Sequence, residues 1–282
     1  MAIRILTDSG SDYEQNEIEK KNIDVIPIPI DLNGISYFDG IDLTKNQFFK
    51  IIEESGSFPK TAQPSPSKYL DYFENARKNG DEVVAIILSS SLSGMYQTVC
   101  LCKEQGGYEN VYIIDSLNAT AGIRLLADTA VKLREEGKSA LQIAGILNSL
   151  KRRIRLYATF PTLKYLVKGG RLSRFEASAA AIARLKPVIT IGQEGEVYVC
   201  HKGVGIKHSL DYMAQKIAEE QIDENYPVFP IYSSDCANCK IMLSKIAARG
   251  INISEELMTN IGPTIGSYVG IGAAGIVYVK KS

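Results

Sequence analysis

A turn with four serines and a glycine, residues 89–94, is the part of this sequence best suited to chemistry. It follows Val83–Leu88, six apolar residues that predict a strand buried on both faces, and it precedes a predicted helix over residues 95–103. Such a turn directs hydroxyls and backbone N–H groups to one place, where open α/β sheets hold an anionic or polar ligand. The sequence therefore predicts a polar binding site here.

The same serines allow a second interpretation, a hydrolase or transferase that uses Ser91 or Ser93 as the nucleophile on a small acyl or phosphoryl substrate. Against it, no GxSxG motif surrounds either serine. The two histidines, His201 and His208, carry no signature that ties them to the turn. A phosphate-handling enzyme is a third possibility, but the chain has no GxxxxGK[ST] loop.

Cysteine and histidine usage does not favour a metal or a cofactor. Cys236 and Cys239 form a CxxC after an apolar run, but no second CxxC or histidine cluster completes a zinc site. We interpret them as cysteines that pack the start of a helix. Five cysteines in a chain of 282 residues do not suggest a disulfide framework. We expect no catalytic residue, no metal and no cofactor.

The overall charge argues against a nucleic-acid partner, because 32 basic residues balance 32 acidic ones. No apolar run has the length of a membrane span, and the first residues enter a strand without a signal-peptide pattern. We expect a cytoplasmic protein.

The repeated order of strand, polar turn and helix predicts the fold. Polar residues follow three predicted strands, at 7–9, 89–91 and 115–116, so hydroxyls and carboxylates should meet at one sheet edge. From about residue 154 the order becomes mixed, with a predicted hairpin over 187–201. We predict an α/β protein with two domains, a doubly wound, mostly parallel domain over 1–155 and an α+β domain over 156–282.

Local signals refine this outline. Asp12 is expected to cap a helix over 13–21, and residues 25–30 to form a strand. Asn33-Gly34 predicts a hairpin. The glycine-rich stretch 261–275 fits either close backbone approach to a ligand or a flexible turn, and the sequence leaves both open.

Six segments together resemble one family, the DegV proteins, whose fatty-acid-binding members are called FakB. They follow the family's order over nearly the whole chain, and their combination is more specific than any one alone. The segments are TDSGSD at 7–12, TAQPSP at 61–66, SSSLSGMYQ at 89–97, LKYLVKGGRLS at 163–173, KPVITI at 186–191 and IGPTIGSYVGIGAAGI at 261–276.

The resemblance implies a lipid carrier rather than an enzyme. A long-chain fatty acid would lie at the domain junction with its acyl chain buried, and its carboxyl group would be presented to a separate fatty acid kinase that makes an acyl phosphate for phospholipid synthesis. Peripheral membrane contact during lipid exchange is a further expectation.

The family's site residues transfer to matching positions of this sequence. Thr61 matches the carboxyl-binding threonine, Ser93 and Gly94 match the SxLSG turn, and Arg171 matches an arginine near the mouth of the site. Tyr268 stands where the family usually has histidine, and a phenol can donate a hydrogen bond but cannot become a cation. The chain also departs from the family pattern at three further positions, Ala62 for serine, Met95 for threonine and Ile271 for proline.

Elementary energetics agrees with these residue types. Burying an acyl chain of ~14 methylenes offers on the order of 11 kcal/mol before ordering costs. A buried carboxylate costs several kcal/mol unless it is hydrogen-bonded, and hydroxyl groups can supply those bonds without an opposite charge.

Overall fold

The computed structural model of the protein describes residues 2–172 and 185–281, so Ser173, the last residue of the LKYLVKGGRLS segment, lies outside the described residues. Its first sheet is parallel. The strands run in the order β2 (Ile23–Ile26), β1 (Ile3–Asp8), β6 (Glu82–Ile87) and β7 (Val111–Asp115). β6 lies between β1 and β7 and is buried from Val83 onward, which confirms the predicted central strand.

The second sheet is antiparallel except for its last pair. Its order is β10 (Val197–His201), β9 (Val188–Ile191), β8 (Ile154–Thr159), β13 (Ala274–Val279), β11 (Phe229–Tyr232) and β12 (Thr259–Asn260). β9 and β10 form the predicted hairpin. A parallel sheet followed by a mixed one matches the predicted α/β fold class, and the division into 1–155 and 156–282 stays a prediction.

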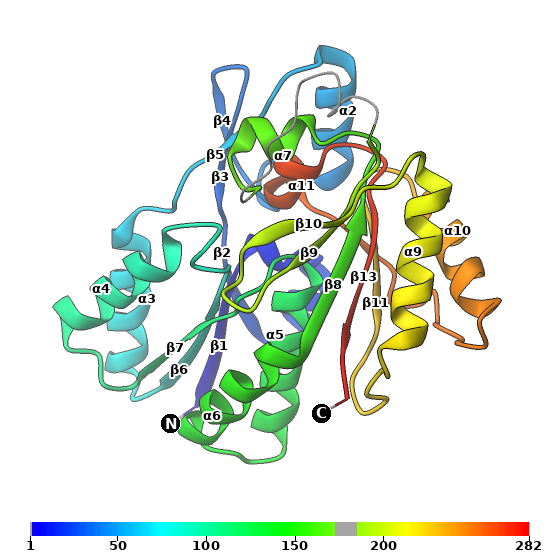
Figure 1. Cartoon of the computed structure of the whole chain (residues 1–282). Helices are drawn as coiled ribbons and strands as arrows, with labels where there is room; N and C mark the ends of the chain where they lie inside the picture. The colour runs from blue at the N-terminus through cyan, green and yellow to red at the C-terminus, as the bar shows by residue number, and fades with distance from the viewer. Residues whose placement is uncertain (1, 173–184, 282) are drawn as a thin grey trace.

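Helices and sheets alternate across the molecule (Figure 1). One helical pair covers the outer face of the parallel sheet, a second pair lies on its inner face, and a third covers the far face of the second sheet. From the parallel sheet outward to the second sheet, the pairs are α3 (Pro66–Lys78) with α4 (Met95–Gly106), α5 (Ala121–Glu135) with α6 (Ala140–Leu150), and α9 (Ile206–Glu219) with α10 (Ala237–Ala247). In the middle pair, α5 contacts β1 and β6 of the first sheet and β8 and β13 of the second.

Three shorter α-helices and two turns of 3-10 helix lie outside these pairs. They are α1 (Gln15–Lys21), α7 (Lys164–Gly169) and α11 (Pro263–Val269), with the 3-10 turns η1 (Ser9–Ser11) and η2 (Lys151–Arg153). None of the helices in residues 2–172 and 185–281 is both long and apolar enough to cross a bilayer.

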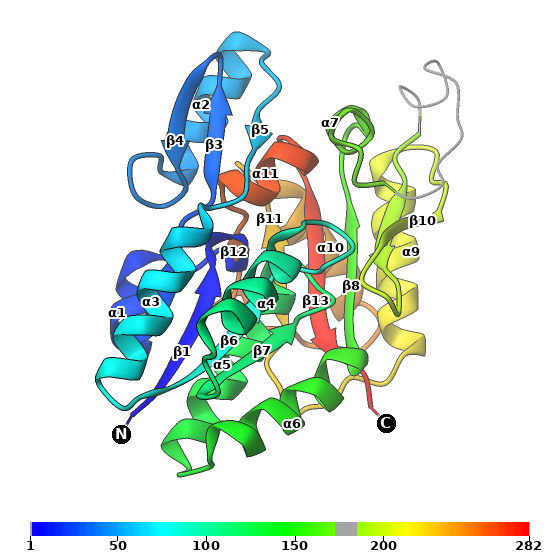
Figure 2. The same ribbon diagram turned by 90° about the vertical axis from the view of Figure 1, so that its left-hand side faces the viewer.

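A small cap stands beyond the carboxyl ends of the parallel strands, at the upper left of Figure 2. We use the name cap for residues 29–61. It contains a three-stranded antiparallel sheet, one helix and a core of its own around Phe48 and Phe49. Its elements are β3 (Pro29–Leu32), β4 (Ile35–Phe38), α2 (Lys45–Ser55) and β5 (Lys60–Thr61).

The cap contains the predicted hairpin and corrects one predicted strand. Asn33 and Gly34 join β3 to β4, and both have positive φ, 57° and 83°, as a two-residue hairpin turn requires. The strand predicted over 25–30 is instead two strands, β2 and β3. The break falls at Pro27 and Pro29, which have no N–H to donate to a sheet.

One further prediction needs correction. Asp12 does not cap a helix over 13–21. It has a φ of 59°, and α1 begins at Gln15 after Glu14, whose side chain forms a capping box with Glu17.

The sequence left two possibilities open for the glycine-rich stretch 261–275. It contains α11, with Pro263 in its first turn, so it is more ordered than a flexible turn.

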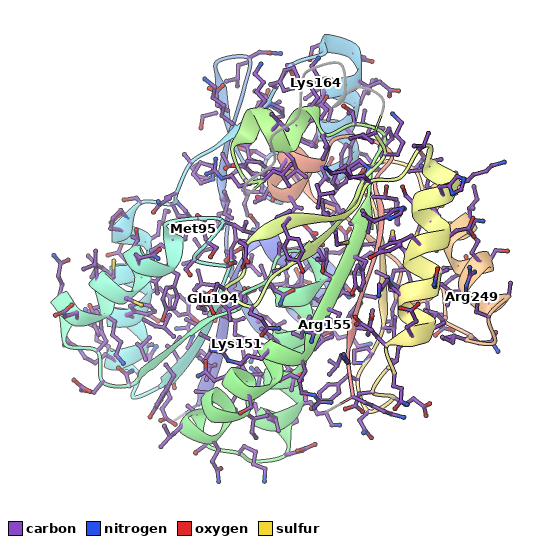
Figure 3. All side chains as sticks on the ribbon, viewed as in Figure 1. Met95, Lys151, Arg155, Lys164, Glu194 and Arg249 are labelled. Atoms are coloured by element: carbon purple, nitrogen blue, oxygen red, sulfur yellow. The ribbon has the colours of Figure 1, made fainter. Side chains whose placement is uncertain are left out.

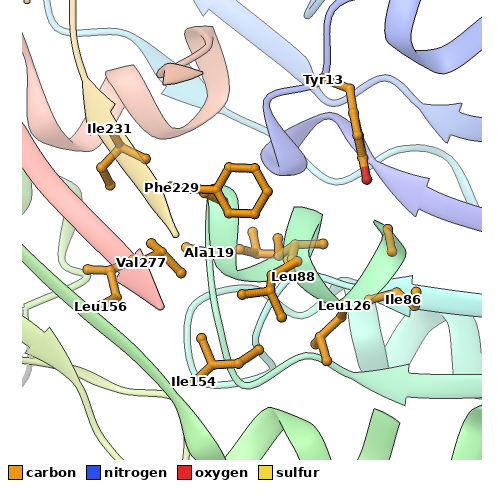
Figure 4. Packing of buried hydrophobic residues seen from close by; sticks show 14 of the residues in the cluster. Tyr13, Ile86, Leu88, Ala119, Leu126, Ile154, Leu156, Phe229, Ile231 and Val277 are labelled. Carbon is orange, nitrogen blue, oxygen red and sulfur yellow. The ribbon is translucent and has the colours of Figure 1, made fainter. Parts of the chain in front are cut away.

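The largest buried cluster fills the space between the two sheets. Residues from the parallel strands, from α5 and from the second sheet all contribute to it. Figure 4 shows Leu88 and Ala119 from the first half of the chain facing Leu156, Ile231 and Val277 from the second. The two halves therefore share one core.

Candidate functional site

A mostly apolar cavity lies within this shared core, near the first residues of α5. Its volume is about 130 Å³, counted as the space open to the centres of water-sized molecules, which is roughly ten times the volume needed for one water. Among the described residues that line it, Arg171 alone carries a charge. The apolar walls come from strands of the second sheet and from Leu88, which directly follows β6 of the first. The residues from the second sheet include Leu156, Ala158, Ile189, Ile191, Val197, Ile231 and Ala274.

Small residues on two paired strands make room for the cavity. Gly275 of β13 pairs with Ala158 of β8, and both line the cavity. A Cβ on Gly275 would lie 2.8 Å from the Tyr157 carbonyl oxygen and 2.9 Å from Ile231 Cγ1. No larger residue fits there, so this part of the sheet stays free of side-chain bulk.

The polar end of the cavity lies where the cap meets α11. Thr61, on β5, and Tyr268, on α11, share a hydrogen bond between Oγ1 and the phenol oxygen at 2.6 Å. Ser93 lies on the same lining, and its hydroxyl accepts the N–H of Met95, the first residue of α4, at 3.3 Å. The three hydroxyls line one cavity, although Thr61 and Tyr268 lie 207 residues apart in sequence.

Arg171 and Gly94 stand beside these hydroxyls. The Arg171 guanidinium donates to the carbonyls of Leu92 and Gly169 at 3.2 and 2.6 Å, and it lies 5.0 Å from the centre of the Tyr268 ring. A Cβ on Gly94 would lie 2.5 Å from the side-chain nitrogen of Gln63, so a larger residue here would require the Gln63 side chain to move. Arg171 is thus held at the mouth by backbone carbonyls with no carboxylate partner among the described residues.

A second hollow of about 350 Å³ continues outward from the polar end and shares Thr61, Arg171 and Tyr268 with the cavity. Its described lining contains lysines and an arginine but no carboxylate. Phe58 lines this hollow, and the Lys168 and Lys164 ammonium groups lie 3.7 and 4.7 Å from the centre of its ring. Figure 3 shows Lys164 at this end of the molecule, on α7. The mouth is therefore basic.

The five residues predicted from sequence, Thr61, Ser93, Gly94, Arg171 and Tyr268, all line the same cavity. Their contact with a ligand stays a prediction. Sequence reasoning missed other lining residues, among them Gln63, Thr120, Thr264, Ala158 and Gly275. Thr120 gave no sequence signal, although the structure marks it with a φ of 49°. Strained residues of this kind often mark functional sites.

The polar turns do meet at one sheet edge, as predicted, but most of their groups bind backbone. Asp8 accepts the Leu88 N–H at 2.8 Å, and Asp115 accepts the Ser90 N–H at 3.1 Å. Ser89 and Ser91 donate to carbonyls of the loop between β9 and β10. Of the serine turn's hydroxyl groups, Ser93 is the one whose residue lines the cavity.

Two buried carboxylates lie behind the cavity wall. Asp12 accepts the Thr120 hydroxyl and the Gly262 N–H, at 2.5 and 2.9 Å. Asp39 accepts from both the N–H and the hydroxyl of Thr264. Burial raises the pKa of Asp39 to about 7 and that of Asp12 to about 6, against hydrogen bonds that favour the charged forms. Both groups therefore titrate near neutral pH.

The two thiols of the CxxC pack at the start of α10, as interpreted from sequence. Cys239 is fully buried, and burial raises its pKa to about 12, so it stays protonated at neutral pH. It is an inert packing group.

The chain matches a family model across almost its whole length. The model is described as an uncharacterised protein of the DegV family, and it matches residues 2–281. A DegV domain-containing protein of Caldanaerobacter subterraneus is 32% identical over 279 residues, 99% of both chains. Another, from Clostridium acetobutylicum, is 30% identical over the same share.

Solved structures resemble the whole chain as well. A DegV family protein from Thermus thermophilus, described by its fatty acid binding, superposes with a TM-score of 0.88 at 28% identity and full coverage of both chains. A fatty-acid-binding DegV family protein from Streptococcus agalactiae gives 0.89 at 26% identity, also with full coverage. A stearic-acid-binding protein from Eubacterium ventriosum gives 0.88 at 25% identity and covers 100% of this chain and 99% of its own.

Proposed function

This chain belongs to the DegV family, and we propose that it binds one long-chain fatty acid without covalent attachment, with the acyl chain in the cavity between the two sheets. The observation that carries the proposal is the polarity of that cavity. Most of its lining is apolar. Thr61, Tyr268 and Arg171, which is the one charged lining residue in the described part of the chain, lie where the cavity adjoins the outer hollow. This polarity matches a long apolar chain with a single anionic end.

The carboxylate would lie between Thr61, Ser93 and Tyr268. In the unliganded geometry Thr61 and Tyr268 bond to each other, and one of these hydroxyls can turn its proton to a carboxylate oxygen instead. Arg171 would add a distant positive charge, and Gly94 would let backbone come close. Neutral donors dominate, so the headgroup would be held without being locked in an ion pair.

A bound headgroup at a basic mouth would be accessible to other macromolecules. We propose a separate fatty acid kinase as the partner that forms the acyl phosphate for phospholipid synthesis, with Lys60, Lys168 and Arg171 facing the transferred phosphoryl group. The same basic face suits peripheral contact with anionic membrane lipids during lipid exchange. Both roles fit a cytoplasmic carrier whose lipid lies at the junction of two domains, and no step of this scheme requires catalysis by the chain itself.

The alternative, a serine hydrolase or transferase, has less support from the geometry. His201 stacks on Tyr212 with ring centres 4.1 Å apart, and His208 lies on α9. No hydrogen bond joins either histidine to Ser91 or Ser93 in the described part of the chain. The phosphate-handling possibility has no better support. The residues GIGAAG at 270–275 match the nucleotide-binding pattern GxGxxG, but they lead into β13 rather than from a strand into a helix. Ester turnover that disappears in Ser93→Ala would support the alternative.

Titration of delipidated protein with palmitate and with methyl palmitate tests the proposal. We expect saturation at one palmitate per chain. Methyl palmitate, which has the same tail and no carboxylate, should bind roughly tenfold or more weakly, because it forfeits charge-assisted hydrogen bonds. Equal affinity for the two lipids would mean that the polar end of the cavity does not bind the carboxylate. Binding of neither lipid would refute the proposal.

A further inference from the structure

The cap contacts helix α11 at three places along its length. Asp39 binds Thr264 near the start of the helix. The rings of Phe48 and Phe49 press on Gly266 in its middle, where a Cβ would lie 2.7 Å from Phe48. Thr61 binds Tyr268 near its end. The cap therefore grips one side of α11 from its first turn to its last.

The same helix, α11, also forms a wall of the acyl cavity. Thr264, Ile265, Tyr268 and Val269 all line it. The helix has only seven residues, a length that is not stable without tertiary contacts. Its position, and with it the position of the Tyr268 hydroxyl, must therefore be set by the segments that hold it.

Asp39 provides the most specific of these contacts. The residue before the helix, Gly262, has no side chain to cap it. A single Asp39 oxygen accepts both the Thr264 N–H at 3.1 Å and the Thr264 hydroxyl at 2.5 Å, in a position that is 6% exposed. A carboxylate at this place also suits the positive end of the helix. The contact joins a cap residue to α11 across 225 positions of sequence.

We propose that Asp39 is a positioning residue for headgroup recognition: through Thr264 it fixes α11, and so keeps the Tyr268 hydroxyl in reach of Thr61 and of a bound carboxylate. The inference rests on the proposed function. It adds a residue about which the family resemblance and the cavity lining say nothing, because Asp39 itself does not line the acyl cavity.

Charge on Asp39 should strengthen this contact. An ionised carboxylate accepts stronger hydrogen bonds than a neutral group, so protonation of Asp39 loosens the start of α11. Lipid release should then quicken as the pH falls. Asp12, which follows η1, is the charged group that acts directly on Asp39, and it raises the pKa of Asp39 further. Asp24 of β2, Glu14 before α1 and Lys45 of α2 line the same hollow as Asp39.

The test is the rate of palmitate dissociation, measured by transfer to an excess of acceptor vesicles of neutral phosphatidylcholine, for wild type and Asp39→Asn. The amide keeps the volume and an acceptor oxygen but lacks the charge. At pH 8 we expect roughly tenfold faster release from the variant, since a charge-assisted hydrogen bond becomes a neutral one. The difference should shrink toward none by pH 5.5. The ratio of the two rates cancels the titration of the lipid.

Asp42→Asn is the matched control. Asp42 lies in the same loop and accepts the Phe38 N–H, away from α11, so its variant should release palmitate at the wild-type rate at every pH. Thr264→Val keeps the carboxylate but removes one of its donors. Thr264→Val should release palmitate faster than wild type. In the double variant with Asp39→Asn, the increase in release rate should be smaller than the product of the two single increases, because both substitutions weaken the same contact.

Three results would overturn the inference. These are equal release from wild type and Asp39→Asn at pH 8, a constant ratio across pH, or the same acceleration in Asp42→Asn. If Asp39→Asn fails to fold, the release rate of Thr264→Val is compared with that of wild type across the same pH range. A wild-type rate in Thr264→Val would also contradict the inference. Failure of wild type to bind palmitate at all would instead refute the proposed function.

Discussion

Replacing Ala158 by leucine is expected to abolish most lipid binding while leaving the protein folded. Ala158 lines the acyl cavity from β8, next to Gly275, and is 5% exposed. The larger side chain would occupy the space of about three methylenes, which at ~0.8 kcal/mol each corresponds to roughly 50-fold weaker binding. Filling a cavity with apolar atoms generally maintains or raises stability, so the melting temperature should not fall.

Thr159→Val is the control for this variant. Thr159 is the next residue of β8, so its side chain faces the opposite side of the sheet, and it does not line the cavity. Its buried hydroxyl has no hydrogen-bond partner among the described residues, so valine should leave both affinity and stability unchanged. Undiminished palmitate binding by a folded Ala158→Leu protein would mean that the acyl chain lies elsewhere.

Thr61→Val should weaken palmitate binding with little change in thermal stability. Valine has the shape of threonine and suits a strand, but it cannot donate to a carboxylate. Hydrogen bonds to charged groups contribute about 1.5–3 kcal/mol, so the expected loss is roughly 10- to 150-fold. Methyl palmitate should bind the variant and wild type about equally, since the ester has no carboxylate to lose.

Ser91→Ala serves as the matched deletion of a hydroxyl. Ser91 belongs to the serine turn, but its hydroxyl donates to the Glu194 carbonyl and the residue does not line the cavity. It should bind palmitate as wild type does. Titration calorimetry on delipidated proteins gives both affinities. Wild-type affinity in Thr61→Val would exclude Thr61 from the headgroup site.

Much of the fold follows from local rules that one sequence displays. The central strand was predictable because Val83–Leu88 is uniformly apolar, and the hairpin at Asn33-Gly34 because few residues tolerate positive φ. The errors arose where tertiary contacts override local preference. Asp12 has the residue type of a helix cap, yet its carboxylate binds Thr120 and Gly262, more than 100 positions away.

The site was predictable only in part, for a similar reason. The serine turn could be located from strand and helix signals, but the pairing of Thr61 with Tyr268 spans 207 positions and leaves no periodic trace. The family resemblance named the five predicted site residues. It did not indicate Ala158 and Gly275, because small residues that leave space empty look like ordinary strand residues.

Native mass spectrometry of the protein purified from a bacterial host tests the central claim most directly, with spectra taken before and after extraction with organic solvent. The account predicts a mass excess of one fatty acid per chain that disappears on extraction and returns with added palmitate or oleate. An unchanged mass before and after extraction, with no uptake of either lipid, would contradict it.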